Sequence, residues 1–194
     1  TFDVAFLDIS MPGKDGLTLA KEMKSIQPVM NLIMVTAYPQ FALDAVKLYE
    51  DKEPATLTLI VGDGDERDKL HQQAKDLGLK TVYFLGNVDQ QALRHLYNLA
   101  DVSLIPSRRE PFGLVALEAM ACGIPVIATN QGGLPDFVND SVGALVEPEN
   151  AEELADAILR VLKRGEQVGA AEWRREISDY ARKHYAQDTI MREL

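Results

Sequence analysis

The chain has 194 residues, a formal net charge of −10 and a hydrophobic content of 46%. This length suits one large domain or two small ones. The negative charge argues against a duplex-binding surface, which needs clustered lysine and arginine. No run of residues reaches the roughly 18–20 apolar residues of a membrane-spanning helix. We therefore expect neither a nucleic acid nor a membrane as a partner.

Cys122 is the only cysteine, so the sequence excludes an internal disulfide and a cysteine metal cluster. It lies at the expected end of a helix, where we interpret it as a buried small hydrophobic residue. The first residues lack the basic and apolar regions of a signal peptide. We expect no cofactor. A single cysteine fits a cytoplasmic protein, either in its natural cell or expressed recombinantly.

Short apolar runs typical of strands alternate with helical patterns along the whole chain. The strand-like runs are 4–7, 32–35, 57–61, 82–85, 102–105, 126–128 and 144–146. Near-continuous apolarity indicates a parallel sheet that helices cover on both faces. The sequence therefore predicts a single three-layer, doubly wound α/β domain with a mostly parallel sheet of about six or seven strands.

Helical spacing of apolar residues fills the gaps between these strands. The clearest helix spans 151–163, where Asn150 can cap the start and Lys163, Arg164 and Gly165 mark the end. A final amphipathic helix is expected to bury one stripe of side chains, namely Trp173, Ile177, Tyr180, Ala181 and Tyr185.

The first fifty residues carry a motif of their own. The run Phe6-Leu7-Asp8-Ile9-Ser10-Met11-Pro12-Gly13-Lys14-Asp15-Gly16 places an aspartate at a strand end, before a turn and a helix. Residues 1–49 resemble a response-regulator receiver of the CheY-like type. The resemblance implies that Asp8 is the phosphoacceptor and Thr36 the switch hydroxyl.

Receiver chemistry needs Mg²⁺ and a lysine that pairs with the phosphoryl group. The receiver segments that supply the acidic pair and the lysine are absent, so Asp8 is at most a partial metal ligand. The alternative is that Asp8 is a solvated residue at a strand end.

The longer motif lies downstream, where Glu110-Pro111-Phe112-Gly113-Leu114 is followed by a second acid at Glu118. Glu110 precedes a helix, so its carboxylate can face the crevice at the strand ends. The N–H groups of Phe112, Gly113 and Leu114 open that helix and can receive a diphosphate. Glu118 lies nearly two turns further on and can reach a ribose diol.

Residues 57–194 resemble the C-terminal Rossmann-like domain of family 4 glycosyltransferases of the GT-B type, the sucrose-phosphate-synthase and glycogen-synthase-like group. The resemblance implies that Glu110 contacts the donor sugar, Glu118 the ribose hydroxyls, and the Asn87–Val88 backbone the base. It also places Gly132 and Gly133 in a tight turn near the phosphates. The partner would be a nucleotide diphosphate or a nucleotide sugar.

Each of these residues also has a purely structural interpretation. Glu118 can be a salt-bridged helix residue, and Gly132-Gly133 an ordinary turn. Arg108 and Arg109 are more simply a solvated loop pair than phosphate ligands.

Two features of the family are not found at their expected places. Receiver-like sequence stands where the family has the strand that precedes its Arg…Lys pair, and we expect no N-terminal acceptor domain. We therefore interpret residues 1–194 as one α/β domain of an engineered chimera, joined at 50–56, with Leu32–Val35 beside Leu57–Val61. It would lack full catalytic activity and keep a vestigial sugar-nucleotide crevice. The alternatives are a residual phosphoacceptor that uses Asp8, and an active glycosyltransferase domain of a retaining enzyme.

Overall fold

A single parallel sheet organises the chain. The computed structural model describes residues 31–35, 40–52, 56–79, 81–108 and 110–185. Within them, six strands form one sheet in the order β3-β2-β1-β4-β5-β6, and every neighbouring pair is parallel. The strands are β1 (Asn31–Val35), β2 (Thr56–Val61), β3 (Val82–Gly86), β4 (Val102–Ile105), β5 (Val126–Thr129) and β6 (Gly143–Val146). Strands predicted between 32 and 146 are thus confirmed, and the one predicted at 4–7 lies outside the described residues.

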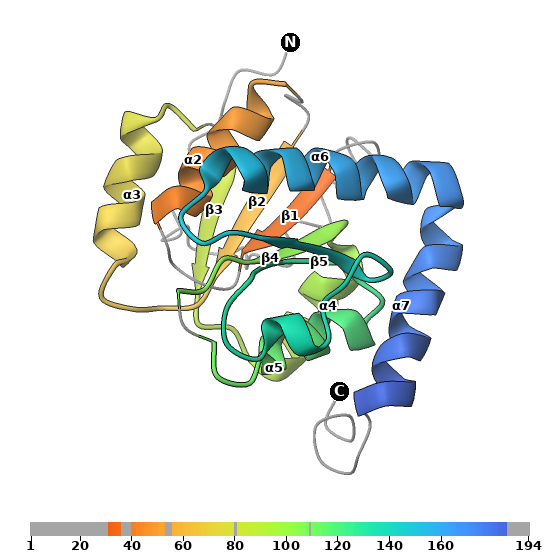
Figure 1. Ribbon diagram of the computed structural model, residues 1–194. Helices are drawn as coiled ribbons and strands as arrows, with labels where there is room; N and C mark the ends of the chain where they lie inside the picture. The colour runs from red at the N-terminus through yellow and green to blue at the C-terminus, as the bar shows by residue number, and fades with distance from the viewer. Residues whose placement is uncertain (1–30, 36–39, 53–55, 80, 109, 186–194) are drawn as a thin grey trace.

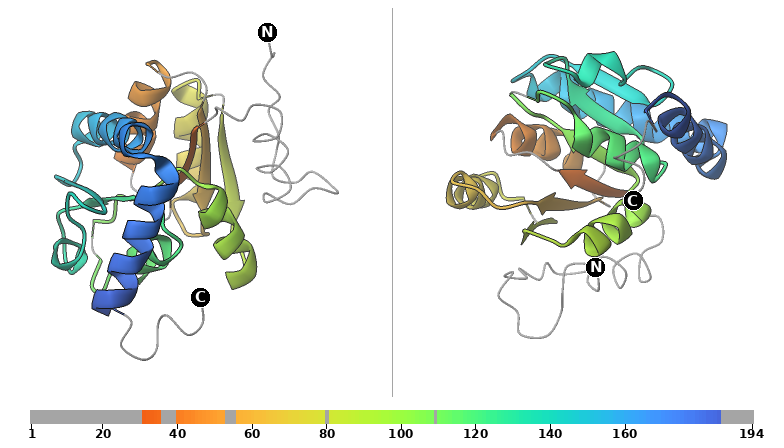
Figure 2. Two further views of the ribbon diagram at one scale, coloured as in Figure 1. Left: turned by 90° about the vertical axis from the view of Figure 1, so that its right-hand side faces the viewer. Right: turned by 90° about the horizontal axis from the view of Figure 1, so that it is seen from below.

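Helices cover both faces of the sheet, as the near-continuous apolar strands predicted (Figure 1, Figure 2). They are α2 (Gln40–Glu50), α3 (Arg67–Asp76), α4 (Gln90–Leu99), α5 (Leu114–Ala121), α6 (Ala151–Val168) and α7 (Ala170–Tyr185), with a 3₁₀ turn η1 at Leu134–Asp136. α2 and α6 pack against each other on one face, and α7 leaves the end of α6 to pack on α5. In the described part of the chain, no helix is long and apolar enough to cross a membrane.

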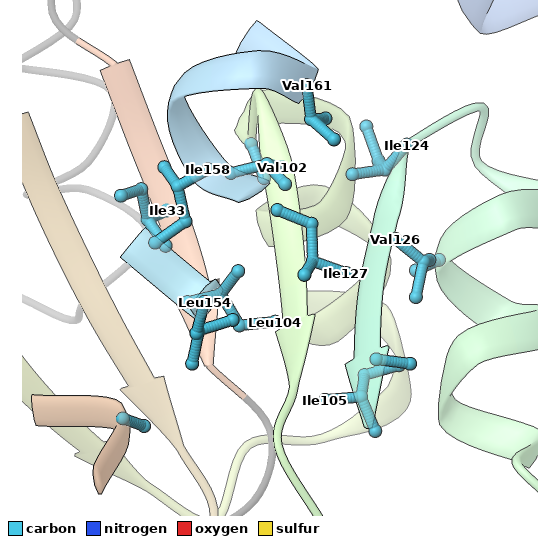
Figure 3. Packing of buried hydrophobic residues seen from close by; sticks show 14 of the residues in the cluster. Ile33, Val102, Leu104, Ile105, Ile124, Val126, Ile127, Leu154, Ile158 and Val161 are labelled. Atoms are coloured by element: carbon cyan, nitrogen blue, oxygen red, sulfur yellow. The ribbon is translucent and has the colours of Figure 1, made fainter. Parts of the chain in front are cut away.

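β1 occupies the middle of the sheet. Ile33 of β1 lies opposite Thr58 of β2 on one side and opposite Val102 of β4 on the other. The expected adjacency of Leu32–Val35 and Leu57–Val61 is therefore confirmed. Figure 3 shows Ile33 beside the α6 residue Ile158, and Leu104 of β4 beside Leu154 of α6, within one apolar cluster.

α2 belongs to the same core. Six of its residues are buried: Phe41, Ala42, Leu43, Ala45, Val46 and Tyr49. The Tyr49 hydroxyl accepts a hydrogen bond from the Asn31 side chain at 3.0 Å, which ties the end of α2 to the start of β1. The described part of the segment before residue 50 thus contributes a central strand and a packed helix.

α6 is longer than the sequence predicts. Its expected end at Gly165 is wrong, because the helix continues to Val168 and stops at Gly169, whose φ is 89°. Gly165 instead lies beside the Trp173 ring, where a Cβ would make an ordinary contact at 3.6 Å. The Arg164 guanidinium stacks over the same ring at 4.9 Å. Tertiary packing thus carries the helix past the first glycine, and Gly169 adopts the positive φ that ends it.

α7 is attached to the ends of α4 and α5. Arg174 donates hydrogen bonds to the carbonyl oxygens of Asn98 and Ala100, both at 3.0 Å. Ser178 donates to the Ala121 carbonyl at 2.9 Å. Trp173, Ile177 and Ala181 are buried as predicted, whereas Tyr180 and Tyr185 are only half-buried.

Two leucines of α2 allow a matched test of its place in the core. Leu43 is 2% exposed and Leu48 is 38% exposed. Leu43→Ala leaves a cavity, so we expect it to lower the free energy of unfolding by about 2–5 kcal/mol. Leu48→Ala should cost less than about 1 kcal/mol, because its side chain is partly in water already. Urea unfolding measures both, and equal small losses would show that α2 is not core.

Candidate functional site

The candidate site lies at the carboxyl edge of the sheet, near β1 and β4. From β1 the chain passes through α2 to β2, and from β4 it passes through α5 to β5 on the opposite side of β1. Ligands of doubly wound α/β sheets bind outside the carboxyl ends of the strands at such a switch point. The predicted donor-binding residues lie at this edge. Asn87 and Val88 follow β3, and Glu110, Phe112 and Gly113 follow β4. Leu114 and Glu118 belong to α5, and Gly132 and Gly133 follow β5.

Glu110 is held by both its side chain and its backbone. Its carboxylate Oε1 accepts a hydrogen bond from the Gly113 amide at 3.0 Å. Its carbonyl oxygen accepts from the Gly133 amide at 3.1 Å. The structure thus brings Glu110, Gly113 and Gly133 together. The Gly113 N–H already has a partner, so an incoming diphosphate would have to displace the Glu110 carboxylate from it.

The glycines of these loops are required by close packing. Gly113 has a φ of 65°, and a Cβ there would lie 2.3 Å from the Phe137 ring. Gly132 has a φ of 57°, and a Cβ there would lie 2.0 Å from the Glu110 carbonyl oxygen. Both angles are in the left-handed region that favours glycine. At Gly132 the turn therefore has no room for a side chain against the loop after β4.

The loops after β4 and β5 are also joined below the surface. The buried Thr129 hydroxyl donates a hydrogen bond to the Ser107 carbonyl at 2.6 Å. Arg108 is exposed, in line with a solvated loop residue, and its Nε lies 3.0 Å from the Glu149 carboxylate. Glu149 adopts a φ of 60°, which is uncommon for a residue with a side chain. Arg109 lies outside the described residues.

The helix start presents apolar side chains to solvent. Phe112 is 75% exposed and Leu114 is 43% exposed. Asn87 is exposed and Val88 half-buried in the loop between β3 and α4. Asp89 ends that loop, and its carboxylate accepts from the Ala92 amide at 2.7 Å, which caps α4. The edge of the sheet is thus open at the positions predicted to meet the base and the diphosphate.

Glu118 connects α5 with the start of α4. It is half-buried, and its carboxylate is hydrogen-bonded by the side chain of Gln90. Burial raises the pKa of Glu118, and the Gln90 hydrogen bond opposes that rise. Gln90 follows directly after the 87–89 loop, so Glu118 lies next to the segment predicted to contact the base.

The charge of Glu118 also acts on Tyr97 and Cys122. Tyr97 is fully buried, and burial together with the nearby Glu118 raises the pKa of its hydroxyl. Burial also raises the pKa of the Cys122 thiol, although the residue is half-buried rather than buried as expected. Among the described residues no group of His, Cys, Asp or Glu could hold a metal ion.

Sequence reasoning missed several supporting residues. The role of Gln90 could have been predicted, because Gln90 is the first residue of the helix that follows the Asn87–Val88 loop. Tyr97 and Phe137 carry no motif, since their roles depend on contacts across the fold. The phosphoacceptor-like Asp8 and the switch-like Thr36 lie outside the described residues.

Fold and edge loops together define a Rossmann-like domain of the GT-B type, and comparison with known proteins agrees. The family described as "Glycosyl transferases group 1" matches residues 21–184, so the chain belongs to this family. The match is continuous through the predicted junction at 50–56, and the comparisons give no support to a receiver origin for 1–49 or to a chimera.

Curated relatives are glycosyltransferases. The chain is 46% identical over 106 residues to an uncharacterized glycosyltransferase, MJ1607, of Methanocaldococcus jannaschii, covering 54% of this chain and 27% of the relative. It is 36% identical over 165 residues to a D-inositol 3-phosphate glycosyltransferase of Mycobacteroides abscessus, covering 81% of this chain and 37% of the relative. The chain thus spans little more than a third of the length of such relatives at most.

Solved structures share the fold. The sucrose-phosphate synthase of Thermosynechococcus elongatus superposes with a TM-score of 0.64 at 30% identity, over 84% of this chain and 43% of that one. The C-terminal domain of LpcC, a group 1 glycosyl transferase family protein of Francisella tularensis, gives 0.65 at 26% identity over 86% and 92%. Anabaena Alr3699/HepE, in complex with UDP and glucose, gives 0.66 at 26% identity over 96% and 53%.

The raised pKa of Glu118 predicts a pH-dependent effect of its replacement. The unfolded carboxyl titrates near 4.5 and the folded one at higher pH, so the folded state binds the proton more tightly. Wild-type stability therefore falls, as far as this group is concerned, as the pH rises above the unfolded value. Glu118→Gln keeps an acceptor for Gln90 and removes the charge. We expect its Tm to exceed that of wild type increasingly from about pH 4 to pH 7.

The exposed Glu176 of α7 provides the control. Glu176→Gln makes the same replacement at a solvent-exposed position, and the Tm difference of Glu118→Gln is compared with that of Glu176→Gln at each pH. A Tm difference for Glu118→Gln that stays constant from acid to neutral pH would show that its carboxylate is not penalised by burial.

Proposed function

We propose that this chain is the donor-binding half of a retaining GT-B glycosyltransferase and binds a nucleoside diphosphate sugar at the carboxyl edge of its sheet. The observation that carries this proposal is the placement of the two acids. Glu110 lies at the helix start and is bonded to Gly133, while Glu118 is bonded to Gln90 beside the Asn87–Val88 loop. One acid thus lies near the proposed sugar and phosphate position and the other near the base position.

The proposed roles come from the resemblance to family 4 glycosyltransferases, and this arrangement is compatible with them. The Asn87–Val88 backbone meets the base, and Glu118 accepts hydrogen bonds from the ribose hydroxyls. The amides of Phe112, Gly113 and Leu114 face the diphosphate, and Gly132 and Gly133 keep the opposite wall close. Glu110 exchanges its bond to Gly113 for a hydroxyl of the donor sugar. The presence of UDP and glucose in the similar Alr3699/HepE structure supports this class of ligand.

The first described arginines after β2 and after β4 already have acidic partners. Arg67 lies 3.6 Å from Asp63 after β2, and Arg108 is paired with Glu149 after β4. A diphosphate has to compete with these carboxylates, so we expect weak binding. Sugar transfer is proposed for the complete two-domain fold, because an acceptor and a closing domain are needed to exclude water and orient the attack.

Membership of the family favours a domain of an active glycosyltransferase over an inactive chimera. The receiver-like origin of 1–49 stays a prediction that rests on the run Phe6–Gly16. It does not change the proposed donor site, because that site is built from residues after β2.

Titration calorimetry with UDP, ADP and GDP tests the proposal. At least one nucleotide should bind with a Kd below about 1 mM. Glu118→Gln replaces a charged acceptor for the ribose, so its Kd should rise about tenfold. Glu176→Gln, on the outer side of α7, should bind as wild type does. Absence of heat with all three nucleotides at millimolar concentration would contradict the proposal.

A further inference from the structure

The end of α7 contacts the loop that carries Gly132 and Gly133. Tyr185, the last residue of α7, donates a hydrogen bond from its hydroxyl to the Asp136 carbonyl at 3.1 Å. Its ring lies edge-on to Phe137 with centroids 5.6 Å apart. Asp136 and Phe137 end the short turn η1, so a residue 49 positions away holds this turn by two different contacts.

One contact continues through side chains to the start of α5. Phe137 is 4% exposed, and its ring tip occupies the space where a Cβ of Gly113 would lie, at 2.3 Å. The Phe137 ring therefore fixes how closely the Gly113 backbone approaches the sheet edge. Tyr185 packs against the same ring from the solvent side.

The second contact continues through the backbone. The Asp136 amide donates to the Gly133 carbonyl at 3.2 Å, and the Gly133 amide donates to the Glu110 carbonyl at 3.1 Å. The hydroxyl of Tyr185 is thus two backbone hydrogen bonds away from Glu110. Burial raises the pKa of Tyr185, together with its hydrogen bond to Tyr180 and the nearby Asp136, so the hydroxyl remains protonated at neutral pH.

We propose that Tyr185 is a positioning residue for the diphosphate-binding loops, holding Gly113 and Glu110 in place through Phe137 and Asp136. This inference rests on the proposed donor site and adds a specific support to it. Ligand sites need loops held close to their productive geometry, and buried neighbours provide that order. α7 thereby couples the outer layer of the fold to the mouth of the crevice.

Two variants of α7 make a matched test. Tyr185→Phe removes the hydroxyl bond to Asp136, together with the hydroxyl's interaction with Tyr180, and keeps the ring contact with Phe137. Ser178→Ala removes a similar hydroxyl bond from the same helix, to Ala121 at the far end of α5. Both changes delete one hydrogen bond from a hydroxyl to a backbone carbonyl, so both should lower the Tm slightly.

Only the first variant should alter the site. In amide NMR spectra of the whole chain, Tyr185→Phe is expected to shift the Gly133 and Gly113 resonances, and Ser178→Ala to leave them in place. UDP should bind Tyr185→Phe about fivefold more weakly than wild type and Ser178→Ala equally well. Unchanged Gly133 and Gly113 resonances in Tyr185→Phe would overturn the inference, as would equal UDP affinity in a wild type that binds UDP. A wild type that binds no nucleotide contradicts the proposed function instead, and the resonances then still decide whether Tyr185 orders the loops.

Discussion

The pairing of β1 between β2 and β4 is the constraint on which the rest of the structure depends. A strand bonded on both sides joins two halves of a parallel sheet, β3-β2 on one side and β4-β5-β6 on the other. Ile33 is fully buried there, under a layer that includes α6 (Figure 3). Because β2 and β3 are added on one side of β1 and β4 to β6 on the other, the position of β1 also sets where a ligand can bind at the carboxyl edge.

Glu110 is the corresponding centre of the site. Its carboxylate binds Gly113 and its carbonyl binds Gly133, so the loops after β4 and β5 meet at one residue. In the proposed function, a diphosphate takes over the Gly113 amide and releases the carboxylate for a sugar hydroxyl. The proposed site is thus internally satisfied without ligand, and binding exchanges hydrogen bonds rather than filling unpaired groups.

The strands and layers could be predicted from the sequence. A parallel strand that helices cover on both faces is apolar along its whole length, and short runs of this kind alternate with helical patterns here. The spacing of Glu110 and Glu118 indicated a candidate region for the site, and the assignment of that region stays a prediction. The end of α6 at Gly169 was not predictable, since packing of Trp173 on Gly165 decides it. The capping of Gly113 by Glu110 and the contact of Tyr185 with Asp136 depend on loop conformation and on a neighbour distant in sequence, which no periodic pattern reports.

Native-state amide hydrogen exchange tests the central place of β1 most directly. If β1 joins both halves of the sheet, the amides of Asn31–Val35 should exchange only through global unfolding, with the same free energy as those of Val102–Ile105. Exchange of β1 through a separate opening of lower free energy, while β4 and β5 stay protected, would contradict this account.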